Sequence, residues 1–248
     1  MKKLILSLMI FALIAGMVFA GGQKDENVVT IASDATWPPM EYVNADKEIV
    51  GFDIDLIKAI AEAGGFEVEI KNTAWDGIFA GLANNSYDAV ISSVTITEER
   101  KAAMDFSNPY INAGQVIIVA EANNGVSILS DLKGENVGAQ IGTTGAIAID
   151  EADGVTLKTY DEIGFAVEDL ANGNLAAVVA DGPIAADFVM SNDNYKNVLK
   201  IVGEPFTEEF YGIAVKKGNT DLMNMINKGL AATIESGTRD ELVSKWLR

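Results

Sequence analysis

Ser92-Ser93-Val94-Thr95-Ile96-Thr97-Glu98-Glu99-Arg100 follows an apolar run at 87–91 that is rich in β-branched and aromatic residues. Such a run predicts a buried strand, so the hydroxyl residues lie where the chain leaves a sheet. Thr97 and the two acids after it predict a helix N-terminus, because threonine caps a first turn and the helix dipole favours negative charge there. Arg100 does not fit this preference.

Arg100 places a cation in a first helical turn, where an exposed positive charge is disfavoured by about 0.3–1 kcal/mol. An anion bound between Arg100, the hydroxyls and the free amides of the helix start would remove this penalty. A structural alternative is an ion pair on a solvated surface with Glu98, Glu99 or Asp105. Spacing alone leaves both interpretations open.

The composition of the 248-residue chain restricts its class. Hydrophobic residues make up 49%, enough for one large domain or two lobes. The net charge of −18 argues against nucleic acid or anionic lipid as a partner and is compatible with cationic small molecules. The sequence has no histidine and no cysteine. A Ser-His-Asp triad, a Cys-His dyad, disulfides and the usual zinc sites are therefore excluded, and no cofactor is expected.

The first 20 residues have the pattern of a secretory signal peptide: Lys2 and Lys3, an apolar run over 4–19, and Val18-Phe19-Ala20 as a cleavage pattern. The apolar run is shorter than the roughly 20 residues that span a bilayer comfortably. We expect cleavage and a periplasmic mature chain, with retention as an uncleaved anchor as the alternative. Residues 21–27 are expected to form a flexible leader.

Strand and helix patterns alternate along the rest of the chain. Strands are expected at 28–32, 66–70, 87–91, 115–120, 136–140, 157–160, 176–180 and 211–215, and helical segments at 51–61, 75–83, 128–132, 146–151, 161–171, 181–190, 220–236 and 238–247. This order predicts an α/β fold with parallel sheets and right-handed crossovers. Two runs of similar size suggest two lobes, with ligand at the carboxyl ends of the strands.

Several segments resemble the periplasmic amino-acid-binding proteins of ABC transporters, solute-binding protein family 3, which includes glutamine-, histidine-, arginine- and lysine/arginine/ornithine-binding proteins. The matching segments are Asp34 with Trp37-Pro38-Pro39, residues 51–56, 95–100, 105–110 and 140–145, Asp181, and residues 211–214. The resemblance implies the two-lobed periplasmic binding protein fold (type II), each lobe a sheet flanked by helices, with a ligand cleft between them. It puts 28–111 and 212–248 in lobe one, 115–207 in lobe two, and hinges at 112–114 and 208–211.

The resemblance implies that Arg100 binds the α-carboxylate of an amino acid through two parallel hydrogen bonds. Thr95, with the backbone and hydroxyl of Thr143 or Thr144, would complete that site. A planar guanidinium suits a carboxylate. Thr143 and Thr144 could also simply cap a helix.

Asp181 is implied to take the α-ammonium group, helped by Ser93. Each pole of a zwitterion loses hydration in a cleft, so each needs an opposite charge or several hydrogen bonds. Because Arg100 and Asp181 fall in different expected lobes, a ligand between them would favour closure. The alternative for Asp181 is a plain helix N-cap. Glu41 and Asp53 are interpreted as structural charges on a surface or loop.

Trp37 and Trp75 are implied to flank the ligand side chain, and Asp34 to meet its polar end; core packing is the alternative for the tryptophans. This set suits a cationic tip. Gln140 before Ile-Gly-Thr-Thr-Gly resembles the arginine-type branch, whereas the glutamine-binding type carries lysine there. Asp34, however, also occurs in the glutamine-binding type. We therefore expect a basic amino acid such as arginine or lysine, with glutamine or another polar amino acid as the alternative.

The resemblance thus implies a monomeric, non-enzymatic receptor that hands a free amino acid to an ABC transporter permease. An enzyme similar to the cyclohexadienyl dehydratases would instead need a carboxylic acid of raised pKa near a leaving hydroxyl. Asp34 or Glu41 could serve, but neither has a recognisable catalytic set around it. A ligand-binding domain of a sensor or channel would require fused signalling or membrane segments, which we do not expect here.

Overall fold

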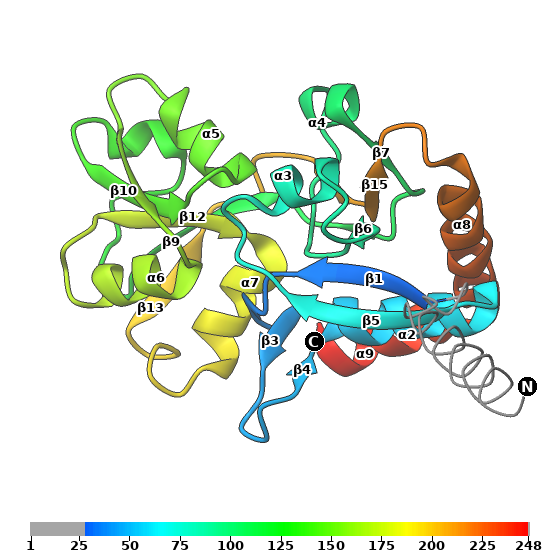
Figure 1. Ribbon diagram of the computed structural model, residues 1–248. Helices are drawn as coiled ribbons and strands as arrows, with labels where there is room; N and C mark the ends of the chain where they lie inside the picture. The colour runs from blue at the N-terminus through cyan, green and yellow to red at the C-terminus, as the bar shows by residue number, and fades with distance from the viewer. Residues whose placement is uncertain (1–27, 248) are drawn as a thin grey trace, which may run out of the picture.

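The computed structural model describes residues 28–247, and the expected signal peptide and leader lie outside this range. Strands gather in two separate sheets, each with helices around it (Figure 1). These two lobes confirm the mixed α/β class and the two-lobed architecture. Over residues 28–247, no helix is long and apolar enough to cross a membrane.

The first lobe is built on a five-stranded sheet of order β5-β1-β6-β15-β7. Its strands are β1 (Val28–Ser33), β5 (Glu67–Asn72), β6 (Ala89–Val90), β7 (Met104–Phe106) and β15 (Ala214–Lys216). The helices in this part of the chain are α2 (Phe52–Gly64), α3 (Ile78–Ala83), α4 (Glu98–Ala103), α8 (Thr220–Glu235) and α9 (Thr238–Trp246). β1 runs parallel to β5 and β6, whereas β15 runs antiparallel to β6 and β7.

The second lobe has a sheet of order β11-β10-β12-β9-β13. Its strands are β9 (Gln115–Ala120), β10 (Asn136–Gln140), β11 (Thr156–Tyr160), β12 (Ala177–Asp181) and β13 (Leu199–Val202). Its helical segments are η1 (Leu129–Leu132), α5 (Thr144–Asp150), α6 (Ile163–Ala171), α7 (Gly182–Ala186) and η2 (Asp187–Ser191). β10 runs parallel to β11 and β12, and β9 runs antiparallel to β12 and β13.

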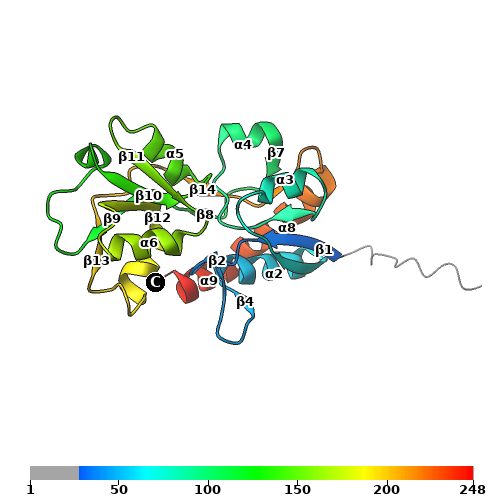
Figure 2. The same cartoon turned by 60° about the vertical axis from the view of Figure 1, so that its left-hand side comes forward.

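Two short strands, β8 (Ile111–Asn112) and β14 (Phe210–Tyr211), pair antiparallel between the two sheets (Figure 2). The chain therefore passes from one sheet to the other beside itself, once in each direction. This pair overlaps the segments expected as hinges, whose bending remains a prediction. A further small sheet joins β2 (Thr36–Trp37), β3 (Glu41–Val43) and β4 (Ile49–Val50).

The expectation of parallel sheets is correct for β5-β1-β6 and for β11-β10-β12, and it is wrong for β15 and β9. Parallel neighbours need a crossover connection, usually a helix. β9 and β15 instead follow directly after the passages between lobes, so they enter their sheets in the opposite direction. Residues 36–37 form a short strand that ends before Pro38.

Helix α2 shows how the apolar spacing of the sequence builds the core of the first lobe. Phe52, Leu56 and Ile60 recur every four residues and are completely buried. Gly65 ends the helix in a left-handed conformation, φ 79°, as glycine permits. Helix α8 packs closely on α2, since a Cβ at Gly229 would lie 2.2 Å from the Ile60 carbonyl oxygen.

Candidate functional site

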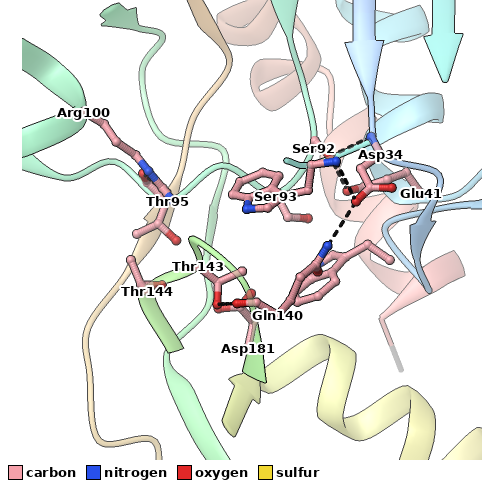
Figure 3. Close-up of a pocket in the computed structure, with 12 residues that line it drawn as sticks. Asp34, Glu41, Ser92, Ser93, Thr95, Arg100, Gln140, Thr143, Thr144 and Asp181 are labelled. Carbon is pink, nitrogen blue, oxygen red and sulfur yellow. Dashed lines mark hydrogen bonds between the residues drawn. The ribbon is translucent and has the colours of Figure 1, made fainter. Parts of the chain in front are cut away.

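The ten residues predicted from the sequence to bind ligand all line one cavity of about 320 Å³ between the lobes (Figure 3). They are Asp34, Trp37, Trp75, Ser93, Thr95, Arg100, Gln140, Thr143, Thr144 and Asp181. Glu41 and Ser92 also line the cavity and were not among the predicted residues.

Arg100 lies at one end of the cavity, in the first turn of α4. The expected cap is present, because the Thr97 side chain accepts a hydrogen bond from the Arg100 amide at 3.1 Å. The guanidinium donates to the carbonyl oxygens of Thr95 at 2.9 Å and Gly142 at 3.2 Å. A guanidinium has five N–H groups, so three remain beyond these described contacts.

The described contacts of Arg100 do not include the surface ion pair that was considered as an alternative. Lys101 pairs with Glu98 at 2.8 Å, and Lys217 pairs with Asp105 at 2.8 Å. The Arg100 guanidinium instead stacks near the rings of Trp75 and Phe79, 5.5 and 5.2 Å from their centroids. Burial lowers the pKa of Arg100 from its usual value, although nearby acids oppose this shift.

Asp181 ends β12 and is buried in the wall of the cavity. It occupies the N-cap position of α7, but its side chain makes no capping hydrogen bond, so a plain cap does not explain it. Its carboxylate accepts a hydrogen bond from the Gln115 amide. Burial, then the charge of Glu209, raises the pKa of Asp181 to about 7, against the effects of Tyr211, Gln115 and Arg100. A bound cation would favour its ionised form.

Asp34 lies at the other end of the cavity from Arg100, after β1 (Figure 3). Its carboxylate accepts hydrogen bonds from the Thr36 hydroxyl at 2.9 Å and the Trp75 amide at 3.3 Å. The Gln140 side chain, from the second lobe, donates to it at 3.1 Å. Burial raises the pKa of Asp34, and these hydrogen bonds act in the opposite direction.

Glu41 and Asp53 are completely buried, so their interpretation as surface or loop charges is wrong. The Ser92 hydroxyl donates to Glu41 at 2.9 Å, and Asp53 accepts from the Tyr110 hydroxyl at 2.9 Å. Burial and the charge of Asp53 raise the pKa of Glu41 well above its usual value, and burial raises that of Asp53 to about 6. Glu41 therefore holds its proton more firmly and lies beside Asp34 at this end of the cavity (Figure 3).

The burial of Glu41 depends on a close approach between two backbone segments. A Cβ at Gly51 would lie 2.2 Å from the Met40 carbonyl oxygen, and Gly51 has φ 133°, which favours glycine. This contact folds the small β2-β3-β4 sheet over the start of α2, where Asp53 lies. The local pattern around Glu41 does not reveal such a contact.

Ser93 is held in an unusual conformation that presents its hydroxyl to the cavity. Its φ is 50°, which is uncommon for a residue with a side chain. The Asp53 carboxylate accepts a hydrogen bond from the Ser93 amide at 2.7 Å, and this contact fixes the turn. Within residues 28–247, the buried Ser93 hydroxyl makes no hydrogen bond of ordinary geometry, although it lies close enough to Asp53 to lower the pKa of that carboxyl.

The two threonines at the start of α5 have different surroundings. Thr143 caps the helix by accepting from the Ala146 amide at 3.2 Å, which confirms the capping interpretation for this residue. Thr144 instead donates its hydroxyl to Glu209 at 2.7 Å. Glu209 lies in the connection before β14, and the sequence carried no pattern that pointed to it.

Trp37 and Trp75 satisfy both of the interpretations raised for them. Both are buried in hydrophobic clusters, and both line the cavity. Trp75 makes an edge contact with Phe79, with ring centroids 5.1 Å apart. The aromatic walls are therefore rigid parts of the first lobe.

Comparisons with known proteins agree with this architecture. The model of the bacterial extracellular solute-binding proteins, family 3, matches residues 29–248. A probable histidine-binding protein of Neisseria gonorrhoeae is 35% identical over 258 residues, covering 99% of this chain and 96% of the relative.

Solved structures are also similar over most of the chain. An ancestral arginine-binding protein bound to arginine has a TM-score of 0.85 and 42% identity, covering 90% of this chain and 99% of the other. The ancestral amino acid-binding protein AncCDT-1, a precursor of cyclohexadienyl dehydratase, has a TM-score of 0.83 and 35% identity, covering 90% and 96%. The chain therefore belongs to the bacterial extracellular solute-binding proteins, family 3, as the sequence resemblance predicted.

Proposed function

We propose that this protein binds one free amino acid, preferably with a cationic side chain, and delivers it to an ABC transporter permease. One observation carries the proposal: a single small cavity has a cation, Arg100, at one end, the acid Asp181 in its wall, and the acids Asp34 and Glu41 at the other end. This order of charges matches the carboxylate, ammonium and side-chain tip of a basic amino acid.

The two poles of the ligand backbone meet groups of opposite charge. The free N–H groups of Arg100 suit the α-carboxylate, because a guanidinium pairs with it through two parallel hydrogen bonds. Asp181 and the Ser93 hydroxyl, which both line the cavity, suit the α-ammonium group. Since each pole receives a compensating group, the cost of removing a zwitterion from water is offset.

The end of the cavity beside Asp34 favours a cation over a neutral amide. Asp34 and Glu41 line this end, and Arg100 is the one basic residue among the cavity-lining residues in the described part of the chain. A guanidinium or ammonium tip would stabilise the ionised form of Asp34, whereas the glutamine amide would leave that charge without an opposite charge. The faces of Trp37 and Trp75 add a further preference for a cation.

Contacts between the lobes supply the closed state that a permease would recognise. Gln140 of the second lobe reaches Asp34, and Arg100 reaches the Gly142 carbonyl. A ligand that contacts both lobes binds the closed arrangement more tightly than the open one and shifts the population towards it. Delivery outside the cytoplasmic membrane agrees with the secretory pattern of residues 1–20.

Calorimetry with purified protein and a panel of amino acids tests the proposal. Arginine or lysine should bind tightly at one molecule per chain and be recovered unchanged, with glutamine and histidine weaker. A stronger response to glutamine than to any basic amino acid would reject the cationic preference. Consumption of prephenate or arogenate would favour the dehydratase alternative, for which the raised pKa of Glu41 supplies an acid.

A further inference from the structure

Glu209 is a buried acid at the junction of the lobes that the proposed contacts with the ligand do not use. It lies outside the helices of both lobes, in the connection between β13 and β14, and its exposed fraction is 9%. Its main-chain oxygen accepts from the Ala113 amide at 2.8 Å, which ties together the two passages between lobes. The preceding Glu208 is exposed, so the two adjacent acids have different surroundings.

The Glu209 carboxylate is the acceptor of hydroxyl groups from both lobes. One oxygen, Oε2, accepts from Thr95 of the first lobe at 2.9 Å and from Thr144 of the second at 2.7 Å. The other oxygen, Oε1, accepts from Thr207 at 2.9 Å. The Gln115 amide nitrogen lies 3.4 Å from Oε2 and also donates to Asp181. These contacts place Glu209, Asp181, Thr95 and Thr144 in one network.

The direction of these hydrogen bonds decides what the threonines can do for a ligand. A hydroxyl has one hydrogen to donate, and a carboxylate only accepts. Thr95 and Thr144 both direct that hydrogen at Glu209, and the Thr144 oxygen also accepts from the Gln115 amide at 3.2 Å. Towards the cavity, the two hydroxyls can therefore offer only their remaining oxygen lone pairs. Lone pairs accept from an ammonium group and do not donate to a carboxylate.

We propose that Glu209 is a positioning residue for the ammonium pole of the ligand, acting through the hydroxyls of Thr95 and Thr144. This inference rests on the proposed function, and it revises the expectation that these hydroxyls complete the carboxylate site. The carboxylate then depends on Arg100, while the ammonium group meets Asp181 and two oriented hydroxyl oxygens. The negative charge of Glu209, which acts on Asp181, also favours a cationic group at this place.

Glu209→Gln tests the inference, with Glu208→Gln as the matched control on the adjacent exposed acid. The glutamine amide keeps the size of the side chain but removes the charge and offers one acceptor oxygen in place of two. Two ligands are compared by calorimetry: arginine, and 5-guanidinopentanoate, which is arginine without its α-amino group.

For Glu209→Gln we expect arginine to bind about 10- to 100-fold more weakly, the usual effect of losing hydrogen bonds to a charged group. Binding of 5-guanidinopentanoate should change less than threefold, and Glu208→Gln should alter neither ligand. An equal loss for both ligands would overturn the inference, because it would show a general effect on the fold or on closure. Unchanged binding of arginine would overturn it as well.

A second variant keeps the test decisive if Glu209→Gln does not fold. Thr144→Val removes the oriented hydroxyl at nearly constant volume and should also weaken arginine more than its analogue. An equal effect on the two ligands would contradict the inference. Failure of the wild-type protein to bind any amino acid would reject the proposed function instead, so the two failures are distinguishable.

Discussion

Asp34→Asn tests whether this carboxylate recognises the side chain of the ligand. The substitution keeps the shape of the side chain and removes its charge. Asp34 is 4% exposed and accepts hydrogen bonds from Thr36, Trp75 and Gln140, so it is held in place at the end of the cavity. A cationic tip therefore meets a fixed charge that water screens little.

The magnitude follows from this burial. Two unit charges about 4 Å apart attract by about 4 kcal/mol at an effective dielectric constant of about 20. Removing one partner of a buried charge pair typically costs about 2–5 kcal/mol. We therefore expect arginine to bind Asp34→Asn about 30- to 5,000-fold more weakly. Glutamine carries no charge at its tip and should change less than about tenfold.

The assay is calorimetric titration of arginine, lysine and glutamine into the parent protein, Asp34→Asn and Asp76→Asn. Asp76 is exposed and follows Trp75 in the chain, so it controls for a general change of surface charge. The ranking of ligands should change only in Asp34→Asn. Equal losses for arginine and glutamine, or an unaltered ranking, would refute the assignment of Asp34.

Three further predictions follow from other parts of the cavity. Arg100→Ala should weaken the binding of every amino acid by at least about 30-fold in calorimetry, because all amino acids share the α-carboxylate. Lys101→Ala should bind amino acids like the parent protein. Retained binding by Arg100→Ala would exclude the carboxylate assignment. Asp181 must lose its proton to pair with an ammonium group, and its pKa is about 7. Affinity should therefore fall by up to about tenfold per pH unit below pH 7, with proton release seen as a buffer-dependent heat; no release at pH 6 would contradict this. Asp53→Ala leaves the Ser93 amide and the Tyr110 hydroxyl without their acceptor. Urea unfolding should therefore show a free energy of unfolding lower by about 2 kcal/mol. A stability equal to that of Asp76→Ala would contradict this prediction.

Local patterns in the sequence predicted the helices and the main strands, and the resemblance to a known family supplied most of the residues that meet in the cavity. Helix α2 was recognisable because its apolar residues recur at helical spacing before two glycines. The residues at 92–100 were recognisable because a cation stood in a first helical turn against the dipole. Such signals are contained within a few neighbouring residues, so no knowledge of the fold was needed.

Features that depend on distant contacts were not predictable in this way. Glu41 looks like a surface acid until the approach of Gly51 to Met40 buries it. Glu209 follows another acid in a connecting segment, and only the fold brings Thr95 and Thr144 to it. The antiparallel direction of β9 likewise depends on where the chain crosses between lobes, which alternation of strands and helices does not encode.

The central claim is that one amino acid lies between the lobes with its carboxylate at Arg100, its ammonium group at Asp181 and its side-chain tip at Asp34. A crystal structure of the protein grown with arginine tests this claim most directly. The account predicts two parallel hydrogen bonds from the Arg100 guanidinium to the ligand carboxylate, and the ligand guanidinium beside Asp34. Arginine in the reversed orientation, or bound outside this cavity, would contradict it.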